Sequence, residues 1–395
     1  MEKRAFTSAK SGGQASNSRA GRYAPQHGGY RAFIPSPLPP DPPIRYDEPL
    51  LALLSEADRE LARLDAATEF LPNPDLFVKM FVRKEAVLSS QIEGTQASLV
   101  DLLEHEAKAA TGIVRRVDEV VNYVRAMNTG LERLQTLPLS NRLIREIHGE
   151  LLKGVRGGDR DRGQFRRTQN WIGPEGASIK EARFVPPPPM EVDHSMTELE
   201  RFLHDETPMP LLVRVALVHS QFETVHPFLD GNGRVGRLLI TFILCARGVL
   251  RRPTLYLSHF FKRRRAEYYD RLQAVRDGGA FEEWTAFFLE GVREVASEGT
   301  EAARQILRLR EEHRVLVNEE LRGSTAGHIL LERLFEQPVV TVQFVREAIG
   351  RTYPMANQLV SEFVRLGLLR QISRGARNRV FEYEPYIEIF GELRP

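Results

Sequence analysis

The sequence predicts a mainly helical fold that carries one small β-hairpin and ends in a smaller module of mixed structure. Three observations support this class. From Pro49 to Val295, apolar residues recur near helical spacing over most of the chain. The segment Asn170 to Val185 breaks that spacing around a Gly- and Pro-containing middle, which is typical of a hairpin. From Ala326 to Pro395, helical stretches are followed by short strand-like runs.

The N-terminal elements follow from local composition. Residues 1–30 are expected to be a disordered tail, because they are rich in Ser, Gly, Ala and basic residues with little to bury. The Pro-rich stretch from Pro35 to Pro43 is expected to be extended and to pack against the body. The run Asn73-Pro74-Asp75 predicts a helix start, and Gly94 is well placed to end that helix. Further helices are predicted over residues 96–109, 117–134, 139–152, 190–204, 211–224, 234–246 and 262–275.

The C-terminal part has its own pattern. Residues 296–325 are charged and are predicted to form a helical connector. Helices are then predicted over residues 328–335, 342–349 and 354–366, and strands over 368–372 and 380–383. Three helices followed by a two-stranded hairpin make a winged helix-turn-helix, here over residues 326–395.

Composition narrows the class of protein and its surroundings. The 395 residues are 42% hydrophobic and 27% charged, with a formal net charge of +2. That balance is ordinary for a globular protein and gives no reason to expect nucleic-acid or membrane binding by the whole chain. The apolar run Leu238 to Ala246 is too short to span a bilayer. With Cys245 as the single cysteine, a reducing compartment is the default, so a cytoplasmic protein without a membrane partner is expected.

The densest chemistry lies in the run His226-Pro227-Phe228-Leu229-Asp230-Gly231-Asn232-Gly233-Arg234-Val235-Gly236-Arg237. Its glycines let backbone N–H groups face an anion, and the N-terminus of the following helix adds partial positive charge. Arg234 and Arg237 are three residues apart, so both can face the same loop. Asp230 can hold Mg²⁺ against phosphates, and His226 can take a proton from an attacking hydroxyl. Together these residues predict a phosphate-transfer site.

Each part of this run also has a simpler explanation. A lone histidine is usually structural or exposed, His-x-x-x-Asp can be a metal pair, and Gly-Asn-Gly can be only a turn. Each of these explanations is favoured when its residues are taken alone. Their combination, in this order between two helices, favours a functional site.

The run matches the signature His-Pro-Phe-x-Asp-Gly-Asn-Gly-Arg-x-x-Arg without a departure, so the sequence resembles the Fic family. The resemblance implies a Fic-type helical bundle with an N-terminal region over residues 31–110 and a catalytic core over 111–295. It implies that His226 is the general base and that Asp230 binds Mg²⁺. The anion-binding loop and the phosphate contacts would come from Gly231, Asn232, Gly233, Arg234 and Arg237. Attack on the α-phosphate of ATP would then transfer AMP to a protein hydroxyl and release pyrophosphate.

Two flanking features also resemble the family. The hairpin Asn170 to Val185 resembles the family's flap, which aligns a target segment by strand-like pairing, although a plain surface hairpin explains it too. Tyr268 and Tyr269 lie where the family has the wall of its adenine pocket, and packing in the helical core accounts equally well for at least one of them. For His219, in the helix leading into the motif, a structural role is expected.

A second motif lies at the end of the helix that starts at Pro74. Ser89 and Glu93 share a helix face at i, i+4 spacing, and Gly94 follows them. Without further knowledge this is a solvated glutamate beside a helix-ending glycine. The run also matches the Fic inhibitory motif, Ser/Thr-x-x-x-Glu-Gly/Asn. The resemblance implies that Glu93 pairs with Arg237 and restrains transfer.

Several functions and partners stay open at this point. The same site suits removal of AMP, or transfer of another nucleotide or of phosphate. A DNA-binding regulator whose Fic domain senses ATP is a further alternative, because the C-terminal segment offers Arg365, Arg370, Arg374, Arg377 and Arg379. Packing within the chain or in a homodimer is the other explanation for that module. The sequence does not indicate the target protein, and the chain itself is one candidate.

Overall fold

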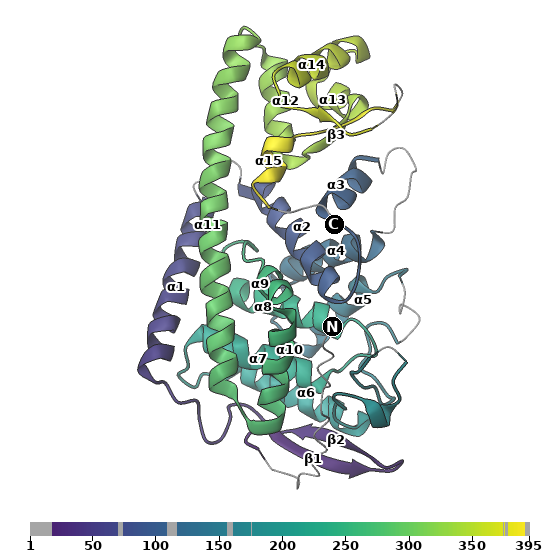
Figure 1. Cartoon of the computed structure of the whole chain (residues 1–395), viewed down its shortest axis with the longest axis vertical. Coiled ribbons are helices and arrows are strands. Elements are labelled where there is room, and N and C mark those ends of the chain that lie inside the picture. The colour runs from purple at the N-terminus through teal and green to yellow at the C-terminus, as the bar shows by residue number, and fades with distance from the viewer. Residues whose placement is uncertain are drawn as a thin grey trace, which may run out of the picture.

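The computed structural model describes residues 18–69, 74–108, 117–155, 161–174, 176–373, 375 and 378–391, without the side chains of 75–77 and 108. This part of the chain is mainly helical with two small antiparallel sheets, which confirms the predicted class (Figure 1). The helices are α1 (Glu48–Glu69), α2 (Pro74–Ile92), α3 (Leu99–Lys108), α4 (Asp118–Arg133), α5 (Asn141–Leu151), α6 (Pro189–His204), α7 (Leu211–Val225), α8 (Asn232–Ala246), α9 (Ser258–Arg263), α10 (Arg265–Gly278), α11 (Phe281–Glu320), α12 (Thr325–Glu336), α13 (Val342–Ile349), α14 (Tyr353–Arg365) and α15 (Glu384–Glu388). The strands are β1 (Gly21–Gln26), β2 (Tyr30–Pro35), β3 (Val339–Thr341), β4 (Arg370–Gln371) and β5 (Val380–Glu382).

Helices α7 and α8 pack against each other at the core of the described residues. Every residue from Leu212 to Val225 and from Asn232 to Leu244 is buried. A helix that is buried on all sides has little freedom to move, because neighbouring side chains fix each of its faces. The turn that joins these two helices is therefore held rigidly at both ends.

Helix α2 packs on α4, α8 and α9, and its C-terminal end lies beside the α7–α8 turn. Gly94, predicted to end this helix, has φ of 100°, a backbone conformation that favours glycine. The Thr95 N–H then donates to the carbonyl of Ser90, which folds the chain back on the helix end. The predicted N-cap, Asn73, lies outside the described residues.

The longest helix, α11, runs along one side of the molecule with α1 packed against it (Figure 1). The connector predicted over residues 296–325 is helical as far as Glu320, and it continues α11 from the preceding segment without a break. Among the described helices, none is both long and apolar enough to cross a membrane.

The prediction of a disordered tail over residues 1–30 is wrong for its last part. Residues 21–26 and 30–35 pair as antiparallel strands β1 and β2. The side chain of Phe33 is 1% exposed, its ring lies 5.0 Å from that of Tyr23, and its N–H donates to the carbonyl of Val185. These contacts to a distant segment supply the burial that the composition of the tail did not indicate. Residues 1–17 lie outside the described part of the chain.

The C-terminal segment contains helices α12, α13 and α14 and a three-stranded sheet of order β3-β5-β4. The three predicted helices and two predicted strands all occur, and the strands are shorter than expected. Strand β3, between α12 and α13, was not predicted. Arg374 and Arg377, in the turn between β4 and β5, are outside the described residues.

Candidate active site

The chain turns sharply between α7 and α8. His226 ends α7 with φ of 48° and ψ of 59°, a left-handed conformation that few non-glycine residues adopt. Gly231 caps α8 with φ of 75°. The free N–H groups and the positive end of the α8 dipole therefore face the loop, as in other helix N-termini that bind anions.

Two polar side chains brace this loop from inside. The amide of Asn232 accepts a hydrogen bond from the Phe228 N–H and donates one to its carbonyl, each at 2.8 Å. His148, on α5, stacks on the Phe228 ring with centroids 3.7 Å apart. Because its Nδ1 accepts from the Gly163 N–H, its Nε2 carries the proton and donates to the Asp230 carbonyl at 3.1 Å. The side chain of Asn232 thus shapes the loop.

The backbone around His226 is held by a buried arginine. Arg166 is 2% exposed and donates to the carbonyls of His226 at 2.9 Å, Val225 at 3.3 Å and Pro187 at 2.6 Å. The Asn170 amide also donates to the His226 carbonyl, at 3.3 Å. These bonds satisfy carbonyls at the end of α7 and fix the direction in which the imidazole leaves the chain.

The His226 imidazole is partly buried and lines a cavity of about 530 Å³. Burial, together with the charges of Arg276 and Arg166, lowers the pKa of His226 to about 3. The imidazole is therefore neutral near pH 7 and has a lone pair available to accept a proton. Its Nδ1 has no hydrogen-bond partner within the described ranges.

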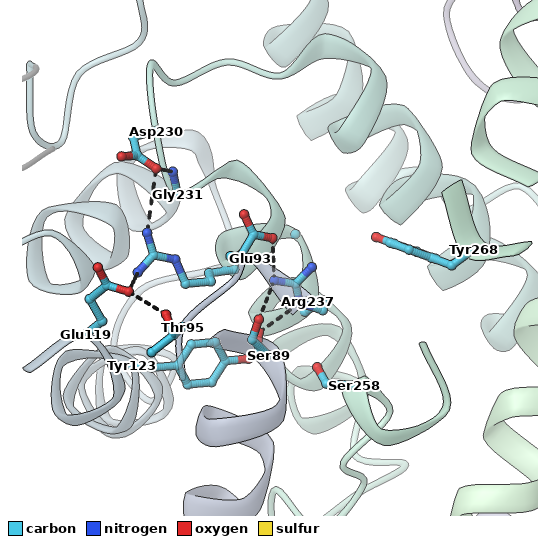
Figure 2. Close-up of polar contacts among 12 residues, drawn as sticks. Ser89, Glu93, Thr95, Glu119, Tyr123, Asp230, Gly231, Arg237, Ser258 and Tyr268 are labelled. Carbon is cyan, nitrogen blue, oxygen red and sulfur yellow. Dashed lines mark hydrogen bonds and ion pairs between the residues drawn. The ribbon is translucent and has the colours of Figure 1, made fainter. Parts of the chain in front are cut away.

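The predicted inhibitory residues meet the second arginine of the motif (Figure 2). Arg237, whose side chain is 2% exposed, donates through Nη2 to Glu93 Oε1 at 2.8 Å. Its Nε donates to Ser89 Oγ at 2.8 Å, and Nη2 also donates to the Ser89 carbonyl at 3.0 Å. Burial alone would raise the pKa of Glu93, but the Arg237 charge holds it below its usual value.

Gly233, in the first turn of α8, lies against the same carboxylate. A Cβ atom at this position would be 2.3 Å from Glu93 Oε1 and 3.0 Å from Arg237 Nη1. No side chain fits there while Glu93 is in place. The carboxylate thus sits on the backbone N-terminal turn where an anion would bind.

The first arginine of the motif, Arg234, lies between two other carboxylates. Its Nη2 is 3.6 Å from Asp230 Oδ1, and its Nη1 is 3.8 Å from Glu119 Oε2. Asp230 Oδ1 also accepts from the Gly231 N–H at 2.6 Å. The Asp230 side chain is 36% exposed, so its carboxylate faces the solvent side of the loop.

Tyr268 and Tyr269 line the cavity together with His226, Gly233 and Arg237. Tyr268 is also a core residue, because it is 1% exposed and its ring stacks on Phe261 at 4.5 Å. Its hydroxyl lies 2.9 Å from His219 Nε2, and His219 Nδ1 lies 3.0 Å from the Gly236 carbonyl, so His219 has the structural role expected of it. Tyr269 is less buried than Tyr268.

In the described part of Asn170 to Val185, the predicted flap hairpin is shorter than expected. A single antiparallel bridge joins Ile172 to Phe184, through N–H to carbonyl bonds of 2.8 and 3.1 Å. A short 3-10 helix, Ile179–Glu181, occupies part of the middle. Between the bridged residues, the loop closes through a capping box at Ser178 and Glu181 in place of further ladder bonds. The bridged segment still borders the cavity.

Sequence reasoning missed several residues that shape this site. Arg166, Asn170 and His148 act on carbonyls of the loop, and Glu119 faces Arg234. Their partners lie far away in the sequence and are mostly backbone atoms, so no spacing pattern marks them. The acidic first turn of α4, where Glu119 lies, was the one available signal.

This geometry defines a helical protein in which a carboxylate of the chain itself lies against the N-terminal turn of α8. Residues 51–132 match the family model described as Fic/DOC family N-terminal, and residues 138–244 match the Fic/DOC family model. These two stretches are therefore a Fic/DOC N-terminal region and a Fic/DOC domain, which confirms the resemblance at that level.

Similar proteins carry related descriptions. A probable protein adenylyltransferase of Aquifex aeolicus is 29% identical over 180 residues, which are 44% of this chain and 51% of that protein. The protein adenylyltransferase Fic of Drosophila grimshawi is 31% identical over 147 residues, 37% of this chain and 27% of that protein. The chain thus spans about half of the first relative and about a quarter of the second.

One solved structure supports the fold. A Fic family protein from Desulfovibrio desulfuricans superposes with a TM-score of 0.54 at 17% identity. The match covers 86% of this chain and 97% of that one. At this identity the match supports the fold alone.

Proposed function

We propose that this protein is an adenylyltransferase that moves AMP from ATP to a Ser, Thr or Tyr hydroxyl of a protein. The observation that carries the proposal is the turn at the N-terminus of α8, where the neutral imidazole of His226 and Arg237 line one cavity and Arg234 lies beside Asp230. The loop of Gly231, Asn232 and Gly233, together with the two arginines, would bind the triphosphate. The relatives described as protein adenylyltransferases support the same reaction.

In this reaction His226 accepts the proton of the incoming hydroxyl, whose oxygen attacks the α-phosphorus. The bond to the bridging oxygen breaks, and pyrophosphate leaves. Backbone N–H groups and the two arginines stabilise the charge that develops on the phosphate oxygens. Tyr268 and Tyr269 would border the base, with Tyr269 the more exposed of the two.

Asp230 suits Mg²⁺ as the metal of this site. Its partly exposed carboxylate offers hard oxygen atoms beside Arg234, where the phosphates would lie. No group of three or more His, Cys, Asp or Glu side chains suited to a metal occurs within the described residues. One carboxylate plus substrate phosphates is the usual way in which proteins hold Mg²⁺, which would supply charge neutralisation on the phosphates.

The same turn supports a brake. Glu93 takes up the charge of Arg237 and lies against Gly233, so the wild-type chain would bind the γ-phosphate poorly or in an unproductive pose. Ser89 would hold Arg237 in that arrangement through its hydroxyl and carbonyl. The Glu93–Arg237 contact supports the proposed subclass, in which the inhibitory motif precedes the catalytic motif.

ATP labelled at the α-phosphate tests both parts of this function. Glu93→Gly should transfer label to protein at least about tenfold faster than wild type, because removing the carboxylate frees Arg237. His226→Ala in the Glu93→Gly background should abolish that transfer. Equal labelling by wild type and Glu93→Gly would reject the brake, and label transfer that survives loss of His226 would reject the base.

Other reactions at this site are separated by the position of the label. Phosphate transfer would incorporate label from the γ-phosphate, and removal of AMP would release label from a protein that already carries it. Transfer of another nucleotide would show as competition by that nucleotide. The proteins that carry the label after electrophoresis would identify the target, and label on this chain would show that it modifies itself.

We further propose that residues 326–395 form a winged helix that packs within the molecule, joined to the core of residues 111–295 by α11. The order of helices α12, α13 and α14 and of the three-stranded sheet supports this module. Arg365 pairs with Glu362 and Glu320, and Arg370 pairs with Glu382 and Glu384, so these arginines are already neutralised. DNA binding is therefore the weaker role, and absence of salt-dependent duplex binding by the full chain would agree with this assignment. A homodimer would be tested by the mass of the chain in solution.

A further inference from the structure

Arg234 is a buried cation with unused donors. Its side chain is 5% exposed, and its distances of 3.6 Å to Asp230 and 3.8 Å to Glu119 are too long for hydrogen bonds. Its Nε and Nη1 atoms have no hydrogen-bond partner in the part of the chain that is described. The two carboxylates balance its charge, while its N–H groups remain available to an anion.

Glu119 is itself held by the segment that carries Glu93. The Thr95 hydroxyl donates at 2.7 Å to Glu119 Oε2, the same oxygen that faces Arg234 (Figure 2). Thr95 lies two residues after Glu93, and its N–H donates to the Ser90 carbonyl at 3.1 Å. A movement of the end of α2 therefore moves Thr95 as well.

We propose that Glu119 is a positioning residue that restrains Arg234, and that Thr95 couples this restraint to the Glu93 segment. The inference rests on the proposed function, in which Arg234 contacts the phosphates of ATP. Glu93 acts on Arg237 by direct contact, and Glu119 acts on Arg234 across the loop. Each arginine of the motif thus faces one carboxylate from outside the motif, Glu93 for Arg237 and Glu119 for Arg234. Both of these carboxylates are linked to the end of α2.

The sign of the effect follows from charge. ATP brings negative phosphate oxygens to Arg234, and the Glu119 carboxylate repels them and competes for the guanidinium. Loss of the Glu119 charge therefore favours ATP. Loss of the Thr95 hydroxyl acts in the same direction, because Glu119 is partly exposed and can then turn toward solvent.

The test compares ATP affinity, by calorimetry with Mg²⁺, among Glu119→Gln, Thr95→Val and the double variant. Asp118→Asn is the matched control, because it removes the same charge from the neighbouring exposed residue of α4. Glu119→Gln should bind ATP at least about threefold more tightly than the control. Thr95→Val should give a smaller gain, and the double variant should equal Glu119→Gln because Thr95 acts through Glu119.

The dependence of ATP affinity on salt concentration distinguishes this electrostatic restraint from a structural effect of the substitution. The ratio of affinities between Glu119→Gln and wild type should fall toward one as ionic strength rises from about 0.05 M to about 0.5 M, because screening removes the repulsion. Equal affinities of Glu119→Gln and Asp118→Asn at low salt would overturn the proposal. Additive effects of the two substitutions would overturn the role of Thr95.

The proposed function fails separately from this inference. If Glu93→Gly transfers no α-label, the reaction itself is wrong, whatever Glu119 does. If Glu93→Gly is active and Glu119→Gln binds ATP like the control, only the second restraint is wrong. If Glu119→Gln lowers the unfolding midpoint, its ATP affinity no longer reports on the charge alone. The test then depends on Thr95→Val, and an ATP affinity equal to that of wild type would contradict the coupling.

Discussion

Arg166 holds His226 in place through the backbone, because its guanidinium donates to the carbonyls of Val225 and His226. The motif predicted His226, Asp230, Arg234 and Arg237, because glycines and charges at that spacing are unusual. Arg166 could not be predicted in the same way. Its partners are carbonyls of two separate segments, Pro187 and the pair Val225 and His226, and only the fold brings these carbonyls to one guanidinium.

Glu223 gives a pH-dependent prediction at the residue scale. Burial is the main cause that raises the pKa of its carboxyl to about 7, from an ordinary value of 4.5. A carboxyl with a raised pKa in the folded state binds its proton more tightly there than in the unfolded chain. It therefore costs stability as pH rises from about 4.5 to about 7, by about 3 kcal/mol at most.

The measurement is the thermal unfolding midpoint at pH 5 and pH 8. Wild type should lose stability between these values, and Glu223→Gln should lose less, because the neutral amide has no proton to release. Glu206→Gln, on an exposed residue, is the control and should follow wild type. An equal loss in Glu223→Gln and wild type would show that Glu223 does not titrate as described.

At the scale of elements, α2 connects the core to Glu93, the residue of the proposed brake. Glu85, Ser89 and Glu93 recur every four residues along one face of this helix. Glu85 is buried and accepts hydrogen bonds from Tyr123 on α4 and from Ser258 on α9. Helix α2 is thus anchored at Glu85 to both α4 and α9. At the end of the helix, Glu93 contacts Arg237. The sequence showed the helix and its end but not this buried anchor.

The packing of α4 on α8 depends on a glycine. A Cβ atom at Gly130 would lie 2.3 Å from the ring of Phe242. Gly130→Ala should therefore lower the free energy of unfolding by about 1–3 kcal/mol through overpacking. Gly149→Ala on α5 is the control, because a Cβ there meets nothing within 4 Å.

Denaturant midpoints of the two variants provide the comparison. Gly149→Ala should be neutral or gain up to about 1 kcal/mol from helix propensity. If Gly130→Ala is as stable as Gly149→Ala, the close approach of α4 and α8 is not as described.

The sequence predicted an element where its stabilising contacts are local, and failed where they join residues distant in the sequence. Helices α4 and α5 have local apolar periodicity, so their existence was predictable. The flap region has one bridge where a ladder was expected. Strand β2 pairs locally with β1, but its bond to Val185 reaches more than 100 positions along the chain. Contacts of such long range leave no local signal.

At the scale of the whole molecule, the C-terminal segment packs against α2, the helix that leads into Glu93. Lys79 Nζ lies 2.5 Å from Glu336 Oε1, and Arg83 Nη1 donates to the Glu336 carbonyl at 3.2 Å. The rings of Phe81 and Phe390 meet edge to face at 5.4 Å. Helix α2 is therefore shared between the Fic/DOC N-terminal region and residues 325–391.

Arg83→Met should loosen this contact, because it removes the bond to Glu336 and the ion pair with Glu106. Hydrogen exchange should speed up in α12 and β3 and stay unchanged in α7 and α8. Arg142→Met is the control, since it removes an exposed ion pair with Glu146 far from this contact. Unchanged exchange in α12 would mean that the C-terminal segment does not depend on α2.

The central claim is that the α8 turn receives a triphosphate while His226 deprotonates an incoming hydroxyl. Mass spectrometry of proteins incubated with Glu93→Gly, ATP and Mg²⁺ tests it most directly. The account predicts that a hydroxyl side chain gains one adenylyl group, and that the gain disappears when His226→Ala is added. A gain of phosphate alone, or an adenylyl gain that is unaffected by His226→Ala, would contradict it.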